Sequence, residues 1–187
     1  MFVLGINGSP RKKGNSQYLM SLFIREMEGK GYETRVLDAT KLDINACIGC
    51  GTCEKKGDCM FKDEFTTLFL PEVIRADIIV ISSPVYFYAF PSKLTALIDR
   101  TQVLWSRKYR LKKNDYKDRD RKGVLLAVGA TKGKDLFDGM DLTVRYFFDA
   151  ADIKYDGNLF FRGVDEKGEM GKHDRVHQDI KLLCEKY

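Results

Sequence analysis

Short apolar runs alternate along this chain with longer segments in which apolar residues recur every three or four positions. The runs predict β-strands, and three of them are almost continuously apolar, as expected for strands covered on both faces of a sheet. The five predicted strands are Phe2–Asn7, Thr34–Asp38, Asp77–Ser82, Gly123–Gly129 and Ile153–Phe161. The longer segments predict helices near Ser16–Lys30, Phe65–Arg75, Pro91–Trp105, Phe137–Ala151 and Gly171–Tyr187.

Strands that alternate with helices in this way predict an α/β fold with a doubly wound parallel sheet. With five strands, the simplest arrangement is the flavodoxin-like order 2-1-3-4-5. A length of 187 residues allows one domain with a large core and is short for two, so we predict a single domain over residues 1–187. Two inserts interrupt the alternation: residues 40–62, which contain most of the cysteines, and residues 106–122, which are rich in Lys and Arg.

Composition narrows the class of protein further. The net charge of +5 is mild and does not by itself indicate a nucleic-acid partner. No stretch approaches the roughly 20 consecutive apolar residues of a membrane span. The chain opens on the strand-like run Phe2–Ile6, which is too short for a signal peptide, so we expect a cytoplasmic protein.

Four of the five cysteines fall within thirteen residues, in the spacing C-x2-C-x2-C-x5-C, with three glycines among them. Thiolates this close together are typical of iron–sulfur or zinc ligands, and a cytoplasmic setting disfavours disulfides. A run of unliganded thiols is the third interpretation. The four residues are Cys47, Cys50, Cys53 and Cys59.

The loop after the first predicted strand, residues 8–16, reads GSPRKKGNS and leads into a helix. Small residues and a helix N-terminus point backbone N–H groups at an anion, and Ser9, Asn15, Ser16 and Arg11 add side-chain donors. The loop lacks the dinucleotide GxGxxG pattern and the Gly-Lys-Ser/Thr of nucleotide triphosphate loops. It therefore predicts a site for a terminal phosphate, the alternative being an ordinary turn with Ser16 as N-cap.

Two further loops should meet this one at the carboxyl edge of the sheet. The third strand leads into Pro84 and several aromatic residues, and the fourth into the small-residue segment Gly129–Gly133. A planar ring between these loops, with a phosphate at the first, describes flavin mononucleotide (FMN) better than a nicotinamide dinucleotide. The alternative that involves no ligand is an apolar loop that covers the strand ends or lies at a subunit contact.

Taken together, the segments GSPRKKGNS at 8–16, CIGCGTCEKKGDC at 47–59 and SPVYFYAFPSKLTALIDR at 83–100 resemble a known family. The chain is similar to the iron–sulfur flavoproteins of the NADPH-dependent FMN reductase-like superfamily over roughly Phe2 to Phe161. The resemblance implies a flavodoxin-like fold that holds FMN and a 4Fe-4S cluster.

The resemblance also implies roles for individual residues. The FMN phosphate would be held by Ser9, Arg11, Asn15 and Ser16. The isoalloxazine ring would lie along Pro84, Val85, Tyr86 and Phe87, with Gly129 and Ala130 on its far side. The cluster would be ligated by Cys47, Cys50, Cys53 and Cys59.

By the same resemblance, electrons would pass from ferredoxin or NAD(P)H to an acceptor such as dioxygen, peroxide or a quinone, in a homodimer or homotetramer. No catalytic residue is predicted. One alternative is a cluster-free NAD(P)H-dependent FMN, quinone or azo reductase. Another, of a different class, is a flavodoxin-like binding module with a structural zinc and no turnover.

Three remaining features have simpler interpretations. His173 and His177 lie four residues apart in the segment HDRVH, which resembles the zinc-binding motif HExxH. The charged residues on both sides of this segment favour a solvated helix face instead. Cys184 is expected to be a buried residue of the last helix. The basic insert at 106–122 is expected to be a solvated loop, with an acidic ferredoxin as its alternative partner.

Overall fold

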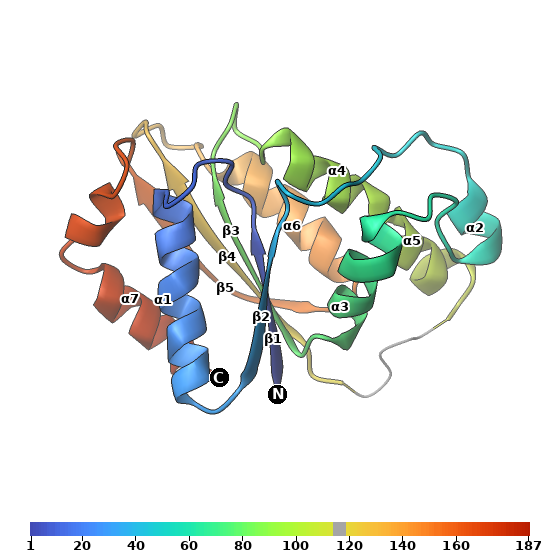
Figure 1. The fold of residues 1–187 in the computed structure, drawn as a ribbon, viewed down its shortest axis with the longest axis horizontal. Coiled ribbons are helices and arrows are strands. Elements are labelled where there is room, and N and C mark those ends of the chain that lie inside the picture. The colour runs from blue at the N-terminus through green and yellow to red at the C-terminus, as the bar shows by residue number, and fades with distance from the viewer. Residues whose placement is uncertain (114–118) are drawn as a thin grey trace.

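Five parallel strands form one sheet in the order β2-β1-β3-β4-β5 (Figure 1). In the computed structural model, residues 1–113 and 119–187 are described, so residues 114–118 of the basic insert lie outside the described residues. The predicted flavodoxin-like α/β fold and its strand order are confirmed. The strands are β1 (Phe2–Asn7), β2 (Glu33–Asp38), β3 (Ile78–Pro84), β4 (Lys122–Gly129) and β5 (Lys154–Arg162).

Helices cover both faces of the sheet (Figure 1). One face carries α1 (Asn15–Gly29) and α7 (Val176–Cys184), and the other carries α3 (Leu70–Arg75), α4 (Ser92–Arg100), α5 (Gln102–Trp105) and α6 (Asp138–Ala150). Shorter helical segments are α2 (Thr52–Lys56), η1 (Phe65–Phe69), η2 (Ser106–Arg110) and η3 (Glu169–Lys172). None of the helices in the described ranges is long and apolar enough to cross a membrane.

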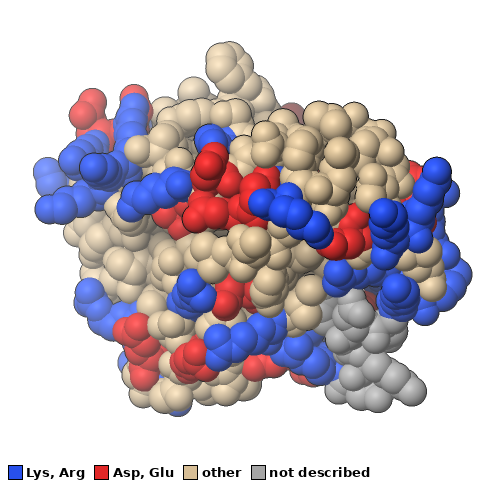
Figure 2. Space-filling model, turned by 45° about the vertical axis from the view of Figure 1, so that its right-hand side comes forward, with Lys and Arg blue, Asp and Glu red and all other residues tan. Residues whose placement is uncertain are grey.

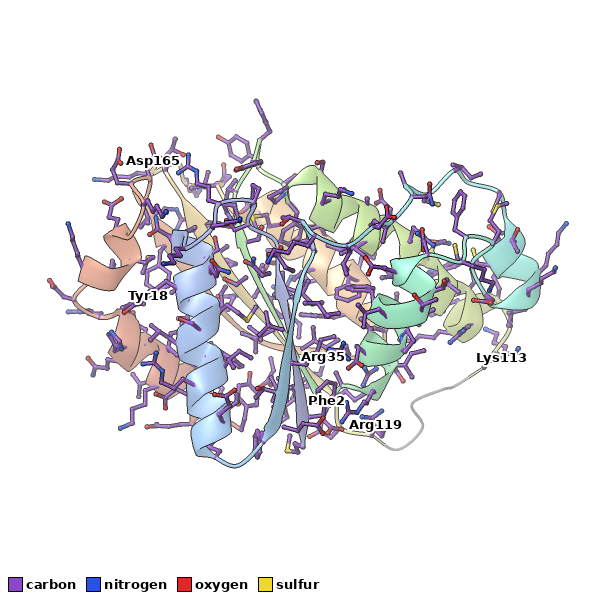
Figure 3. All side chains as sticks on the ribbon, in the orientation of Figure 1. Phe2, Tyr18, Arg35, Lys113, Arg119 and Asp165 are labelled. Atoms are coloured by element: carbon purple, nitrogen blue, oxygen red, sulfur yellow. The ribbon has the colours of Figure 1, made fainter. Side chains whose placement is uncertain are left out.

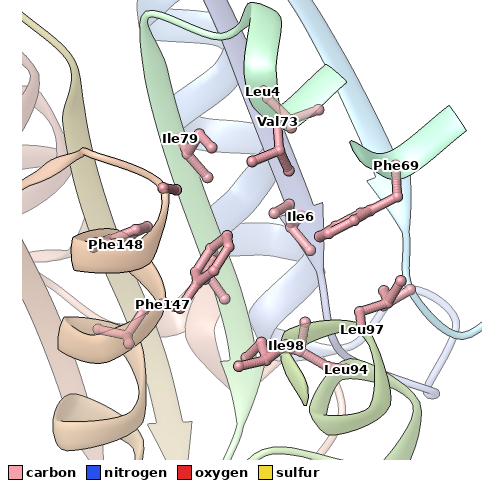
Figure 4. Packing of buried hydrophobic residues seen from close by; sticks show 14 of the residues in the cluster. Leu4, Ile6, Phe69, Val73, Ile79, Leu94, Leu97, Ile98, Phe147 and Phe148 are labelled. Carbon is pink, nitrogen blue, oxygen red and sulfur yellow. The ribbon is translucent and has the colours of Figure 1, made fainter. Parts of the chain in front are cut away.

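The sheet separates two apolar clusters because neighbouring strand residues point to opposite faces. Along β1, Leu4 and Ile6 pack with α3, α4 and α6, whereas Val3 packs with α1 and α7. Figure 4 shows the first cluster, in which Phe147 of α6 and Phe69 of η1 lie over β1 and β3. These buried layers fix the carboxyl ends of β1, β3 and β4, from which the candidate site is built.

Two predicted helices are shorter in the structure than expected, each because of local backbone geometry. The helix expected over Pro91–Trp105 is interrupted at Thr101, where the backbone makes i to i+3 hydrogen bonds on both sides and the hydroxyl donates to Ile98 O at 2.6 Å. The helix expected from Gly171 begins only at Val176, because His173 has an extended backbone between η3 and α7.

The basic insert expected at 106–122 is not a uniform solvated loop in its described part. Its first five residues continue α5 as η2. Near its end, Arg121 is buried, and its guanidinium donates to Ala76 O at 2.8 Å, to Ala151 O at 2.5 Å and to Val73 O. Arg121 therefore ties the ends of α3 and α6 to the start of β4.

Candidate functional site

A pocket of about 90 Å³ opens at the carboxyl edge of the sheet, where open parallel sheets bind their ligands. We call it the edge pocket. It is formed by the loops after β1, β3 and β4 and by the segment after β5. Every residue predicted to bind the cofactor lines it except Phe87. The lining residues are Ser9, Arg11, Gly14, Asn15, Ser16, Pro84, Val85, Tyr86, Val128, Gly129, Ala130, Val164 and Asp165.

The N-terminus of α1 forms one end of the edge pocket. Gly14, and not Ser16, is its N-cap, and the first turn carries no acidic side chain. The first N–H groups of a helix have no acceptor within the helix. The Ser16 hydroxyl is buried and has no hydrogen-bond partner in the described ranges of the chain. Unpaired donors at the positive end of a helix fit a bound phosphate.

Ser9 and Arg11 shape the loop that precedes this helix. Asn7 Oδ1 accepts a hydrogen bond from Ser9 N at 3.4 Å, and Ser9 Oγ accepts one from Arg11 N at 3.3 Å. The Arg11 guanidinium donates to Asp165 O at 3.2 Å and lies 3.9 Å from the Asp165 carboxylate. Because this side chain is 63% exposed, the ion pair is weak and Arg11 can turn to a phosphate.

The segment after β5 closes the pocket, and sequence reasoning missed it. Asn15 Nδ2 donates to Glu166 O at 2.8 Å, and Met170 N donates to Asn15 Oδ1 at 3.1 Å. The Asn15 side chain thus fastens this segment to α1, so both of its polar atoms are engaged. Asp165, labelled in Figure 3 above the upper end of α1, stands on the pocket wall that the segment forms.

The opposite side of the edge pocket is lined mainly by apolar residues. Val85 N donates to Val128 O at 2.9 Å, which holds the loop after β3 against the end of β4. Ala130 lies at the mouth and is exposed. A Cβ at Gly129 would lie 2.5 Å from Leu136 Cδ2, so Gly129 packs closely against the Leu136 side chain. The apolar groups on the two sides of this gap suit an aromatic ring in their chemistry.

Phe87 lies outside this gap. Tyr86 and Ala89 exchange backbone hydrogen bonds of 2.9 Å around a two-residue turn, in which Phe87 (φ 50°) and Tyr88 (φ 62°) are both left-handed. The turn directs the Phe87 side chain fully into solvent, at 100% exposure. A Cβ at Gly139 of α6 would meet Tyr88 O at 2.4 Å, so the turn rests closely on α6. Contact between Phe87 and a flavin stays a prediction.

The four cysteines line a second pocket, of about 90 Å³, which we call the cysteine pocket. Three glycines with positive φ turn the loop around it: Gly49, Gly51 and Gly57. Cys47 and Cys50 are exposed, whereas Cys53 and Cys59 are half-buried. Among the described residues, no three Cys, His, Asp or Glu side chains are arranged to hold a metal ion.

Three cysteine sulfurs have polar neighbours. The hydrogen bond between Cys50 and the Thr52 hydroxyl, 3.3 Å long, lowers the pKa of the Cys50 thiol. Ser106 Oγ lies 3.6 Å from Cys53 Sγ, and Arg100 Nη2 donates to Cys59 Sγ at 3.2 Å. Four thiols that line one pocket, with Ser106 and Arg100 as donors to two of the sulfurs, match the ligands of an iron–sulfur cluster in residue type.

Arg100 is held by Asp63 beneath the cysteine pocket. Arg100 Nη1 donates to Asp63 Oδ2 at 2.6 Å, with 1% of the Arg100 side chain exposed and 14% of Asp63. Burial acts to raise the pKa of Asp63, but hydrogen bonds from Arg100 and Asn45 outweigh it and lower the pKa to about 2. The pair is therefore charged at neutral pH.

The two pockets have no lining residue in common. In Figure 3, Asp165 of the edge pocket lies toward one end of the long axis. Lys113, whose N–H donates to Arg107 O in η2, lies toward the other end. The cysteine pocket is on the Lys113 side, because Arg107 Nε donates to Gly57 O of the cysteine loop at 2.6 Å.

His173 and His177 form no part of either pocket. His177 Nε2 lies 3.0 Å from the Tyr18 hydroxyl on the outer side of α1, and His173 contacts Phe161 edge to face. Both are exposed.

Known flavoproteins are similar to this chain in sequence. A model of the NADPH-dependent FMN reductase family matches residues 1–137. An iron–sulfur flavoprotein of Methanocaldococcus jannaschii is 34% identical over 132 residues, which cover 71% of this chain and 64% of that protein. The chain thus spans less than two thirds of that relative. An iron–sulfur flavoprotein of Methanosarcina thermophila is 27% identical over 193 residues, covering 99% of this chain and 94% of the relative.

Among solved structures, the NAD(P)H:quinone oxidoreductase from Methanothermobacter marburgensis aligns with a TM-score of 0.68 and 15% identity. The alignment covers 98% of this chain and 96% of that one, and at this identity it shows the fold alone. The assignment to a family rests on the match to the family model over residues 1–137. The chain belongs to the NADPH-dependent FMN reductase family, a family of flavin-dependent oxidoreductases, and is related to the iron–sulfur flavoproteins.

Proposed function

We propose that this protein is an electron-transfer oxidoreductase that holds FMN in the edge pocket and a 4Fe-4S cluster in the cysteine pocket. The observation that carries the flavin site is the buried Ser16 hydroxyl, which has no partner among the described residues, at the start of α1, where the N-cap Gly14 offers no side chain. Ser9, Ser16, Arg11 and the backbone at the start of α1 would hold the phosphate. Asn15 would act by fixing the segment after β5.

The ring would lie between Pro84, Val85 and Tyr86 on one side and Gly129 and Ala130 on the other. These walls exclude water from the ring face and orient it. When bound, FMN exchanges electrons in pairs or singly, and a cluster exchanges them one at a time. The ligands of the cluster would be Cys47, Cys50, Cys53 and Cys59.

We propose further that the cluster of one chain serves the flavin of another chain in a homodimer or homotetramer. This is supported by the distinct lining of the two pockets and by their placement toward opposite ends of the molecule (Figure 3). Electrons would enter from ferredoxin or NAD(P)H and leave to dioxygen, peroxide or a quinone.

An acidic protein donor is supported by the charge around the cysteine pocket. Figure 2 shows Lys and Arg side chains gathered on the right-hand part of the face, beside the grey residues. Exposed basic residues lie within the cysteine loop and after the last residue that lines the pocket, and one of them, Arg110, pairs with Glu54 at 3.3 Å. We call this set the basic rim. It comprises Lys55, Lys56, Arg110, Lys112 and Lys113.

The visible spectrum and metal content of protein purified without oxygen test the proposal. A broad absorption near 400 nm over flavin bands, with about four irons and one FMN per chain, is the expected result. Flavin bands without iron would favour the cluster-free FMN-dependent reductase. Zinc without flavin would favour the binding module.

A further inference from the structure

Arg100 is a charged side chain in a place that is costly for a charge. Its side chain is 1% exposed, beneath the cysteine pocket that it helps to line. The guanidinium also lies 4.3 Å from the centre of the Phe65 ring, so its surroundings are partly apolar. A buried arginine needs hydrogen-bond acceptors for its N–H groups, and the identity of those acceptors indicates the role of the residue.

Its donors face two kinds of acceptor. Nη1 donates to Asp63 Oδ2 at 2.6 Å and to Asn45 O at 3.1 Å. Nη2 donates to Cys59 Sγ at 3.2 Å. Nε is buried and has no hydrogen-bond partner within the described ranges. One side of the guanidinium thus anchors Arg100, while the other supplies donors to the cysteine pocket.

We propose that Arg100 sets the reduction potential of the cluster through Cys59, an inference that rests on the proposed function. Hydrogen bonds to ligand sulfurs and the net charge of the surroundings are main determinants of such potentials. A positive charge at the ligand sulfur stabilises the state with the added electron, and burial limits screening by solvent. Arg100 therefore raises the potential, and the Asp63 carboxylate partly offsets this effect.

Cys53 has a weaker neighbour, the neutral Ser106 hydroxyl at 3.6 Å. Hydrogen bonds from charged donors are roughly twice as strong as those between neutral groups. Among the sulfur neighbours found in the described part of the cysteine pocket, Arg100 is thus the strongest electrostatic influence.

Because Arg100 and Asp63 carry opposite charges, removing one or the other should shift the reduction potential of the cluster in opposite directions. Arg100→Gln removes the positive charge and makes the cluster harder to reduce. Asp63→Asn leaves that charge uncompensated and makes the cluster easier to reduce. A purely structural ion pair would lose stability in both variants without moving the potential in opposite directions.

The experiment compares the reduction potentials of the wild type, Arg100→Gln and Asp63→Asn. Each protein is reconstituted anaerobically with iron and sulfide and titrated with dithionite while the cluster is followed by electron paramagnetic resonance. We expect at least a tenfold change in the one-electron equilibrium, about 59 mV, downward for Arg100→Gln and upward for Asp63→Asn. The control is Lys62→Gln, which removes the same charge from an exposed ion pair with Asp58 and should change the equilibrium less than about twofold, or 18 mV.

An unchanged potential in Arg100→Gln with its iron retained would overturn the inference. If that variant holds no cluster, Asp63→Asn decides, and an unchanged or lowered potential overturns it. Loss of the cluster from both variants also overturns it, because the pair would then serve assembly. A wild-type protein that holds no cluster after reconstitution would refute the proposed function instead.

Discussion

Ser16→Ala separates the binding role of the phosphate loop from its structural role. In the protein without ligand, the Ser16 hydroxyl is buried and unpaired in the described part of the chain. A buried polar group without a partner costs about 1–3 kcal/mol. Removing it should therefore leave the ligand-free protein as stable as the wild type or about 1 kcal/mol more stable.

The effect on FMN binding has the opposite sign. A hydrogen bond to a charged group contributes about 1.5–3 kcal/mol, so its loss should raise the Kd for FMN roughly 10- to 150-fold. Protein stripped of FMN is unfolded in urea to measure stability. The Kd is measured by the quenching of flavin fluorescence on binding.

Ser82→Ala is the matched control. Ser82 is equally buried, but its hydroxyl donates to Ser16 O at 2.7 Å. Its loss should lower the free energy of unfolding by about 1 kcal/mol and change FMN affinity little. The reasoning would be refuted by a Ser16→Ala protein that binds FMN as tightly as the wild type, or one destabilised as much as Ser82→Ala.

Three further predictions concern the cysteine pocket and its surroundings. Cys50→Ala should lose iron but keep FMN, so the protein should be yellow. Cys184→Ala, which changes a buried cysteine outside the pocket, should keep the brown colour of the cluster. Iron retained in Cys50→Ala would contradict the proposed set of cluster ligands. Neutralising Lys112 and Lys113 should slow reduction by an acidic ferredoxin at low salt but not reduction by dithionite; equal rates with ferredoxin would count against docking at the basic rim. Because the folded pKa of Asp63, about 2, lies below the ordinary 3.8, its ion pair stabilises the protein by about 2 kcal/mol above pH 5. That contribution is lost as pH falls toward 2, so urea unfolding of the ligand-free protein should show wild type and Asp63→Asn converging at low pH; a constant difference would refute the assignment.

The fold was predictable because its signals are local. Strands such as Ile78–Pro84 are apolar runs, and the helices between them repeat apolar residues at helical spacing. Strand order then followed from the rules of parallel sheets. The break at Thr101 was missed because it depends on one hydroxyl that competes for the Ile98 carbonyl, a preference too small to read from composition.

The site was predictable where it consists of short loops that directly follow strands. Ser16 and Val85 are in such loops, and the rule for parallel sheets brings them to one edge. Val164 and Asp165 were missed because contacts distant in sequence hold them, with Val164 N donating to Gly129 O at 3.0 Å and Asp165 O accepting from Arg11. The exposure of Phe87 was missed because two consecutive left-handed residues without glycine are rare.

The contacts of Arg11 and Asn15 with Asp165, Glu166 and Met170 also order events during synthesis. The phosphate loop leaves the ribosome early, and its wall follows about 150 residues later. Since chains are synthesised at about 5–20 residues per second, about 8 to 30 seconds pass between synthesis of the loop and synthesis of its wall. Flavin capture is therefore expected to be a late step, after translation has passed residue 170, and a nascent chain halted before that point should not retain FMN.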